Sequence, residues 1–204
     1  NLSFNNLSPL SSFLGKPGRK DKGGLQFEEY LSRQRKHHSA EISATIDTEL
    51  FAQKAVEIYG YKHFISDTSG SLCEIVNPDD STDKVLKSLQ QSTLLVWIKG
   101  TDDQAEKLYH RFIKSPKPMF YNEDFLKTKW HAYCKTNNQA PADVDPNEFM
   151  SYGFKALILH RIPIYSKIAK NWGITVESSD LSQLESSDDF VKLIAESIDK
   201  KNKK

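Results

Sequence analysis

The sequence predicts an α/β domain in which helices cover both faces of a mainly parallel sheet. Two apolar segments, Phe64–Ser66 and Leu94–Ile98, carry this prediction. The second is apolar without any alternation of polar and apolar residues, which is typical of a strand covered on both faces. Helical patterns precede and follow both segments, and such alternation of helix and strand is typical of α/β proteins.

Several predicted helices begin or end at capping residues. Gly60 closes a helix, since glycine readily adopts the left-handed conformation of a C-terminal cap. Ser81 caps the start of another helix. Thr101 and Gln104 form a capping-box pattern, and Pro146 stands at the first position of a later helix. The predicted elements are a turn-rich segment over 1–24, helices over 26–46, 49–59, 81–91, 101–112, 123–135, 145–160, 163–171 and 187–199, and strands at 64–66, 94–98 and 174–177.

Residues 114–145 differ in composition from the rest of the chain, because lysines are interspersed with aromatic residues between proline boundaries. Grooves that bind single-stranded nucleic acid use such a mixture. The aromatic residues also lie partly at helical spacing, as in a lid helix that packs on a core, and proline boundaries suit a mobile insert. We therefore expect a helical lid-like insertion over 114–160 within one domain spanning 1–204, and nucleic acid is not the expected partner.

The overall composition indicates a soluble cytoplasmic protein. The formal net charge of +1 favours no class of partner. No apolar run approaches the roughly 20 residues that a membrane span needs, and the pattern of a signal peptide is not seen. Cys73 and Cys134 are isolated, which is typical of reduced thiols in the cytoplasm. Because the chain begins with Asn1 rather than methionine, we also expect a fragment or a processed product.

Several segments together resemble the shikimate-kinase-like branch of the P-loop kinases and ATPases. Thr68–Ser71 lies after an acid, where those enzymes carry a glycine-rich loop at the end of their third strand. Leu94–Ile98 and the helix after it are similar to their fourth strand and its helix. His160–Ala169 is similar to the Arg-x-Pro-x-Tyr-x-x-Ile-Ala segment that leads to their last strand.

The resemblance implies ATP and Mg²⁺ as cofactors and a small-molecule substrate. Members of that group carry a G-x-x-x-x-G-K-[ST] loop, whose amides and lysine hold the phosphates and whose hydroxyl ligates magnesium. This chain lacks the loop, and Pro17 after Lys16 brings neither hydroxyl nor amide hydrogen. Either the first strand and its phosphate loop lie upstream of Asn1, or the protein is a relative that has lost nucleotide chemistry.

The candidate catalytic residue is Asp67. In P-loop proteins an acid at this place helps to position magnesium or water. The candidate phosphate- or substrate-binding residues Ser69, Gly70 and Ser71 follow it and offer amides and hydroxyls to an anion. The alternative is structural, because Asp, Ser and Gly also favour tight turns.

Two arginines complete the candidate site. By resemblance, Arg161 corresponds to an arginine that holds a carboxylate or a phosphate, a task that suits its planar guanidinium. Arg111 lies on the helix before the proline-rich region and could reach phosphates from the base of a lid. For both, the alternative is an exposed helix residue. His38 and Glu41 share a helix face, but two ligands without a third predict no metal site.

These observations predict a nucleotide-dependent phosphotransferase or an ATPase-like protein related to small-molecule kinases. The alternative is a catalytically inactive binding or scaffold domain of the same fold that contacts protein or nucleic acid.

Overall fold

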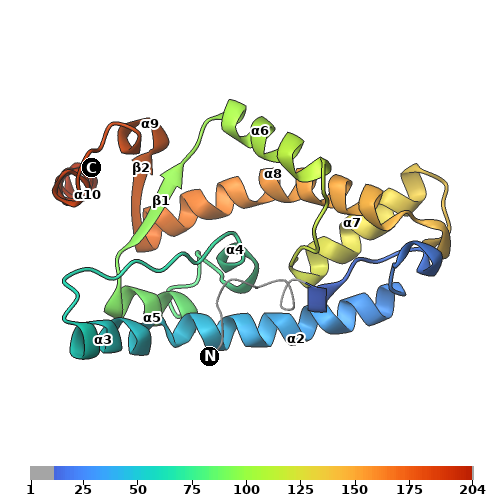
Figure 1. Cartoon of the computed structure of the whole chain (residues 1–204), viewed down its shortest axis with the longest axis horizontal. Helices are drawn as coiled ribbons and strands as arrows, with labels where there is room; N and C mark the ends of the chain where they lie inside the picture. The colour runs from blue at the N-terminus through green and yellow to red at the C-terminus, as the bar shows by residue number, and fades with distance from the viewer. Residues whose placement is uncertain (1–11, 204) are drawn as a thin grey trace. The chain divides into compact units, whose positions relative to one another are not determined.

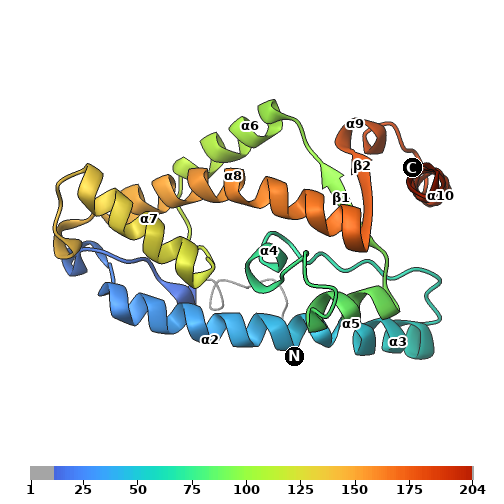
Figure 2. The same cartoon turned by 180° about the vertical axis from the view of Figure 1, so that it is seen from behind.

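The computed structural model describes residues 12–203 and is mainly helical (Figure 1). Helices account for 66% of the described residues and strands for 6%, so the predicted three-layer, P-loop-like α/β fold with a mainly parallel sheet is wrong. In the described part of the chain, the sheet consists of β1 (Leu95–Lys99) and β2 (Gly173–Glu177). The two strands are parallel and lie side by side (Figures 1 and 2), with Leu95 opposite Gly173 and Lys99 opposite Glu177.

The helices are close to their predicted bounds. Of the turn-rich segment predicted over 1–24, residues 1–11 lie outside the described part of the chain. The helices, in chain order, are η1 (Lys20–Lys22), α2 (Phe27–Ile46), α3 (Thr48–Tyr59), α4 (Leu72–Ile75), α5 (Lys84–Ser92), α6 (Asp102–Ile113), α7 (Glu123–Thr136), η2 (Pro141–Asp143), α8 (Pro146–Trp172), α9 (Ser178–Leu181) and α10 (Ser187–Asn202).

The chain divides into two compact units. Unit 1 contains residues 1–42 and 107–160, and unit 2 contains residues 43–106 and 161–204. The segment 114–160, expected as a lid-like insertion, thus belongs to the same unit as the first part of α2. We describe each unit by itself.

Aromatic side chains from α2, α7 and α8 form the core of unit 1. The rings of Phe27 and Trp130 stack with centroids 4.8 Å apart, and Phe149 meets Trp130 edge-on. Such pairs add about 0.5–1.5 kcal/mol to the burial of their surface. Trp130 and Tyr133, two of the aromatic residues in the basic and aromatic segment, are therefore core residues.

A buried glutamine connects α2 to the segment before α7. The Gln34 amide donates to the Met119 carbonyl at 3.0 Å and accepts from the Tyr121 backbone N–H at 3.0 Å. The Tyr30 hydroxyl donates to the same Met119 carbonyl. Buried polar groups are costly unless they are hydrogen-bonded, so these bonds fix the 119–121 segment on α2.

In unit 2, α10 and α9 pack on β2, and α3 packs on α5. Gly173, Ile174 and Val176 are the buried residues of β2, and Leu86 and Leu89 are the most deeply buried residues of α5. The Asp83 carboxylate caps α5 by accepting the Leu86 backbone N–H at 2.9 Å. This cap lies two residues after the predicted Ser81.

The predicted strand over 64–66 is absent, which is the main correction to the sequence prediction. Residues 62–67 have no regular structure, and β1 instead pairs with β2, which lies far along the chain. The Ile65 side chain is 83% exposed. A strand needs a hydrogen-bonded neighbour, and the local apolar pattern does not specify that neighbour.

The predicted break between a helix over 145–160 and one over 163–171 is absent, because α8 continues through Pro163 to Trp172. Proline removes one i→i−4 hydrogen bond. Packing of the following turns, where Ile168 and Ala169 are buried, favours continuation of the helix. By contrast, the Thr101–Gln104 capping box and the left-handed Gly60 cap are confirmed.

Candidate functional site

Asp67, Ser69, Gly70, Ser71 and Arg161 all belong to unit 2. The Asp67 carboxylate accepts the Ser69 backbone N–H at 2.8 Å, and the Ser69 and Ser71 hydroxyls are 3.0 Å apart. Ser69 has a left-handed backbone conformation, with φ of 51°. Asp67 and Ser69 are thus parts of a hydrogen-bonded turn, which fits the structural alternative for these residues.

Arg161 forms a buried ion pair. Its Nε donates to Glu74 Oε1 at 2.8 Å, and the Glu74 side chain is completely buried. A Cβ atom at Gly70 would overlap Arg161 Nη1, so the turn and the guanidinium are in direct contact. The structure therefore brings Gly70 and Arg161 together, and it gives Arg161 an internal carboxylate as a partner.

The neighbouring thiol and phenol are neutral at physiological pH. Burial raises the pKa of Cys73 to about 12, and burial together with the proximity of Cys73 raises the pKa of Tyr165 to about 12. The Tyr165 ring stacks on Trp97 of β1. Since a thiolate is the reactive form of cysteine, Cys73 does not behave as a nucleophile here.

Arg111 belongs to unit 1 and lies in the last turn of α6, where it is exposed. Its proposed contact with phosphates stays a prediction. Within residues 12–203 no three His, Cys, Asp or Glu side chains are grouped closely enough to hold a metal ion. His37 lies 3.6 Å from Glu41 on α2.

One groove in unit 2 has a mainly apolar lining, and we call it the slot. It has a volume of about 720 Å³. Its walls come from α3, from the irregular segment 63–68, from the end of α5 with β1, and from α10. The lining residues are Thr48, Ala52, Val56, residues 63–68, Leu89, residues 92–96, Ile98, Ser187, Phe190, Val191 and Ile194.

The slot is apolar and accessible. Its exposed apolar side chains include Val56 (58% exposed), Ile98 (54%) and Val191 (47%). Among the described residues that line the slot, Asp67 is the only one with a carboxylate, and none is a lysine or an arginine. Such a surface suits an uncharged apolar ligand.

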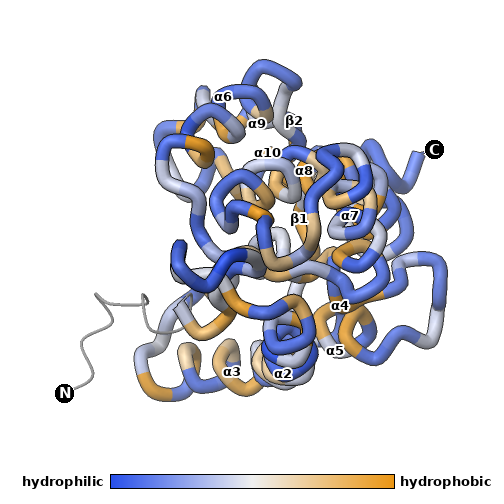
Figure 3. The backbone as a smooth tube through the Cα atoms, turned by 90° about the vertical axis from the view of Figure 1, so that its right-hand side faces the viewer, coloured by the Kyte–Doolittle hydropathy of each residue, from blue (hydrophilic) through white to orange (hydrophobic). Residues whose placement is uncertain are grey.

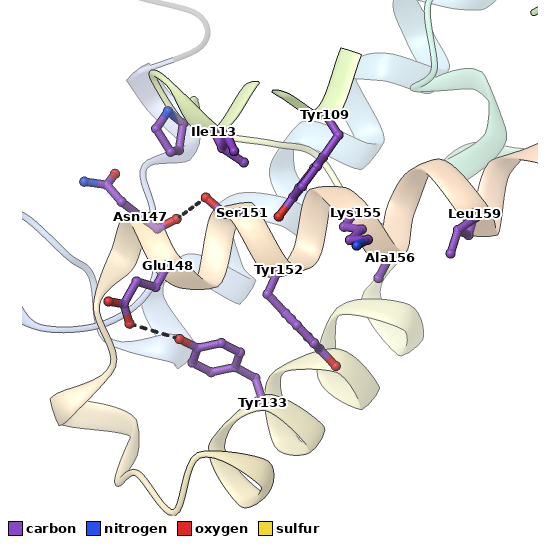
Figure 4. A pocket seen from close by; sticks show the side chains of 11 residues that line it. Tyr109, Ile113, Tyr133, Asn147, Glu148, Ser151, Tyr152, Lys155, Ala156 and Leu159 are labelled. Atoms are coloured by element: carbon purple, nitrogen blue, oxygen red, sulfur yellow. Dashed lines mark hydrogen bonds between the residues drawn. The ribbon is translucent and has the colours of Figure 1, made fainter. Parts of the chain in front are cut away.

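A second groove, of about 820 Å³, lies in unit 1 beside α8 (Figure 4). The Tyr133 hydroxyl donates to Glu148 at 3.3 Å, and burial and the Glu148 charge raise the pKa of Tyr133 to about 12. The Lys155 ammonium lies over the Tyr109 ring, 5.3 Å from its centroid. The charged groups of this groove have internal partners, which leaves the slot as the stronger candidate.

No family model, curated protein or solved structure matches the chain. The resemblance to the shikimate-kinase-like group therefore stays a prediction. No helix in the part of the chain that the structure describes is long and apolar enough to cross a membrane.

The sequence reasoning missed Glu74 and the contribution of α10 to the slot. Glu74 had a signal, because it is a single acid within the apolar run Leu72–Ile75. An acid in an apolar run requires a cation or a hydrogen-bond partner when it is buried. No local sequence pattern predicted that α10 and residues 63–68 would line the same groove.

Proposed function

We propose that this protein is a protein-binding domain that takes up an apolar segment of a partner in the slot. The observation that carries the proposal is the accessible apolar lining of the slot, to which α3, segment 63–68, β1 and α10 all contribute. Soluble proteins rarely expose contiguous apolar surface without a binding role.

The distribution of exposed apolar side chains supports this function. Most of those in the described chain belong to unit 2, and many of them lie in or next to the slot-lining segments. The members in unit 2 are Ile46, Leu50, Phe51, Val56, Ile58, Tyr59, Tyr61, Phe64, Ile65, Leu94, Ile98, Ile162 and Val191. Burying such side chains against a partner would contribute roughly 25 cal/mol per Å² of apolar surface.

The nucleotide-dependent alternative has weaker support. It required Asp67 at the carboxyl end of a strand within a parallel sheet, and residues 62–67 do not form a strand. It also required Arg161 to hold a substrate anion, whereas Arg161 is paired with Glu74. ATP and Mg²⁺ stay predictions that rest on the resemblance alone.

A selection from a random-peptide display library tests the proposed function. We expect apolar peptides to be enriched and to bind the whole chain in fluorescence polarisation. Val191→Asp, in the slot, should lower their affinity at least tenfold. Leu159→Asp, at an exposed apolar position of α8 in unit 1, is the matched control and should have no effect.

Failure to enrich any peptide, or equal binding to the Val191→Asp protein, would contradict the proposal. A thermal-shift measurement with magnesium-ATP tests the nucleotide-dependent function. Nucleotide at 100 times its dissociation constant stabilises a protein by about 2.7 kcal/mol. Such a shift, combined with no peptide binding, would favour the nucleotide-dependent function instead.

A further inference from the structure

We propose that the partner segment binds in the slot as an extended strand that pairs with the open edge of β1. This inference rests on the proposed function and specifies the shape and chemistry of the ligand. It goes beyond apolar contact, because it assigns main-chain hydrogen bonds to the ligand.

Only one edge of β1 is paired within the described residues. Along one edge, residues 95–99 pair with β2. Along the other edge, no residue among 12–203 forms a ladder with them. The open edge of a strand presents unused N–H and C=O groups, and it is the usual template for adding a strand from another chain.

The walls of the slot are of different kinds. The strand β1 supplies one wall, the irregular segment 63–68 another, and α3 and α10 supply helical ones. Both α3 and α10 contribute lining residues, and in Figures 1 and 3 α3 lies below the level of β1 whereas α10 lies at or above it. Strands in parallel sheets have such surroundings, with helices on the faces and strands on the edges.

The lining of the slot carries little charge. Among the described residues that line it, only Asp67 has a carboxylate, and Asp67 lies near one end of segment 63–68. The ligand that complements this lining is a strand that is apolar on both faces, has no acidic residue, and is flanked by a lysine or an arginine that can approach Asp67. A helix would fit the apolar walls but would leave the open edge of β1 without partners.

The test uses a seven-residue peptide of alternating valine and isoleucine that ends in two lysines. Two derivatives carry N-methyl groups on either the odd or the even residues, because alternate amides of a strand point to opposite edges. We expect at least one derivative to lose tenfold or more in affinity for the whole chain. Hydrogen exchange at the backbone amides of 95–99 should slow when the parent peptide binds, while exchange in α7 should not change.

Asp67→Asn tests the charge argument, because asparagine retains an oxygen that can accept the Ser69 N–H. This substitution should lower the affinity of the lysine-ended peptide severalfold, and the affinity of a peptide with uncharged ends should not change. If Asp67→Asn weakens the binding of both peptides equally, the Asp67 charge does not interact with the lysines of the ligand.

The outcomes separate the strand from the general function. One outcome is that the parent peptide binds, with an affinity that Val191→Asp lowers, while both N-methyl derivatives bind as tightly as the parent. In that case the protein-binding function stands and the proposal that the ligand is an extended strand is wrong. If no apolar peptide binds, both proposals fail. A concentration-dependent dimer that Val191→Asp dissociates would show that a second copy of this chain occupies the slot, and would overturn the assignment to a partner protein.

Discussion

The Nε atom of Arg161 donates to Oε1 of Glu74 at 2.8 Å, and this bond joins α8 to the short helix α4 inside unit 2. The Glu74 side chain is fully buried, and that of Arg161 is 14% exposed. A carboxylate without water around it needs a cation close by. The pair therefore holds the turn over 67–71 beside α8, whether or not that turn binds a ligand.

Removing the cation should destabilise the protein strongly. Arg161→Met leaves the Glu74 charge buried without its cation, and we expect a loss of about 3–5 kcal/mol in the free energy of unfolding. The double variant with Glu74→Met should recover much of this loss. Urea denaturation measures both, and Arg111→Met, at an exposed position, is the control and should stay within about 0.5 kcal/mol of the parent. A small effect of Arg161→Met alone would show that the pair is not structural.

Gly70→Ala should cost about 1–3 kcal/mol because the new methyl group overlaps Arg161 Nη1. The cost should shrink in an Arg161→Met background, where the overlapping atoms are missing. A double-mutant cycle by thermal denaturation measures this coupling. An equal cost in both backgrounds would mean that the overlap is not its cause.

Stability at low pH should depend on Glu123 of α7. Hydrogen bonds from Arg35 and Lys127 lower the pKa of its carboxyl to about 2. Because this pKa lies below the unfolded value of roughly 4.3, the carboxylate stabilises the fold above that pH and loses its effect as the pH falls towards 2. Glu123→Gln should therefore lower the melting temperature at pH 7, and the difference from the parent should vanish near pH 2.

The difference in melting temperature between Glu123→Gln and the parent should be small and should decrease with added salt. The reason is that the ion pairs of Glu123 with Arg35 and Lys127 are partly exposed. Glu196→Gln, at an exposed position of α10, controls for the loss of a charge. A difference that stays constant from pH 7 to pH 2 would contradict the assignment to Glu123.

The two cysteines should differ in reactivity. Cys73 is buried, and burial raises its pKa to about 12, whereas Cys134 is only half-buried. An aromatic disulfide reagent at pH 8 should therefore label Cys134 first and Cys73 only after unfolding. The Cys134→Ser protein should show almost no fast labelling, and fast labelling of that variant would mean that the segment around Cys73 opens readily.

Much of the helical structure could be predicted from the sequence because its signals are local. The start of α7 at Glu123, the start of α8 at Pro146 and the end of α3 before Gly60 all follow from capping residues within a few positions. The apolar run at 94–98 identified β1 to within one residue at each end. The predicted break before Pro163 was wrong, because the local cost of a proline in a helix does not include the packing of the turns after it.

The grouping of the candidate site was predictable only in part. The sequence motifs led to Gly70 and Arg161, and the structure places them in contact. The motifs gave no indication that Arg161 pairs with Glu74, because the two residues are 87 positions apart. Nor did they indicate that β1 would pair with β2 and leave its other edge open among the described residues.

The amino-acid sequence alone determined where most helices begin and end and which segments are apolar, since propensities and caps act over a few neighbouring residues. The tertiary structure alone decided the class of the fold, the partner of β1, the partner of Arg161 and the walls of the slot. Each of these depends on contacts between distant segments, whose free energy comes from burial and hydrogen bonding that no local pattern encodes.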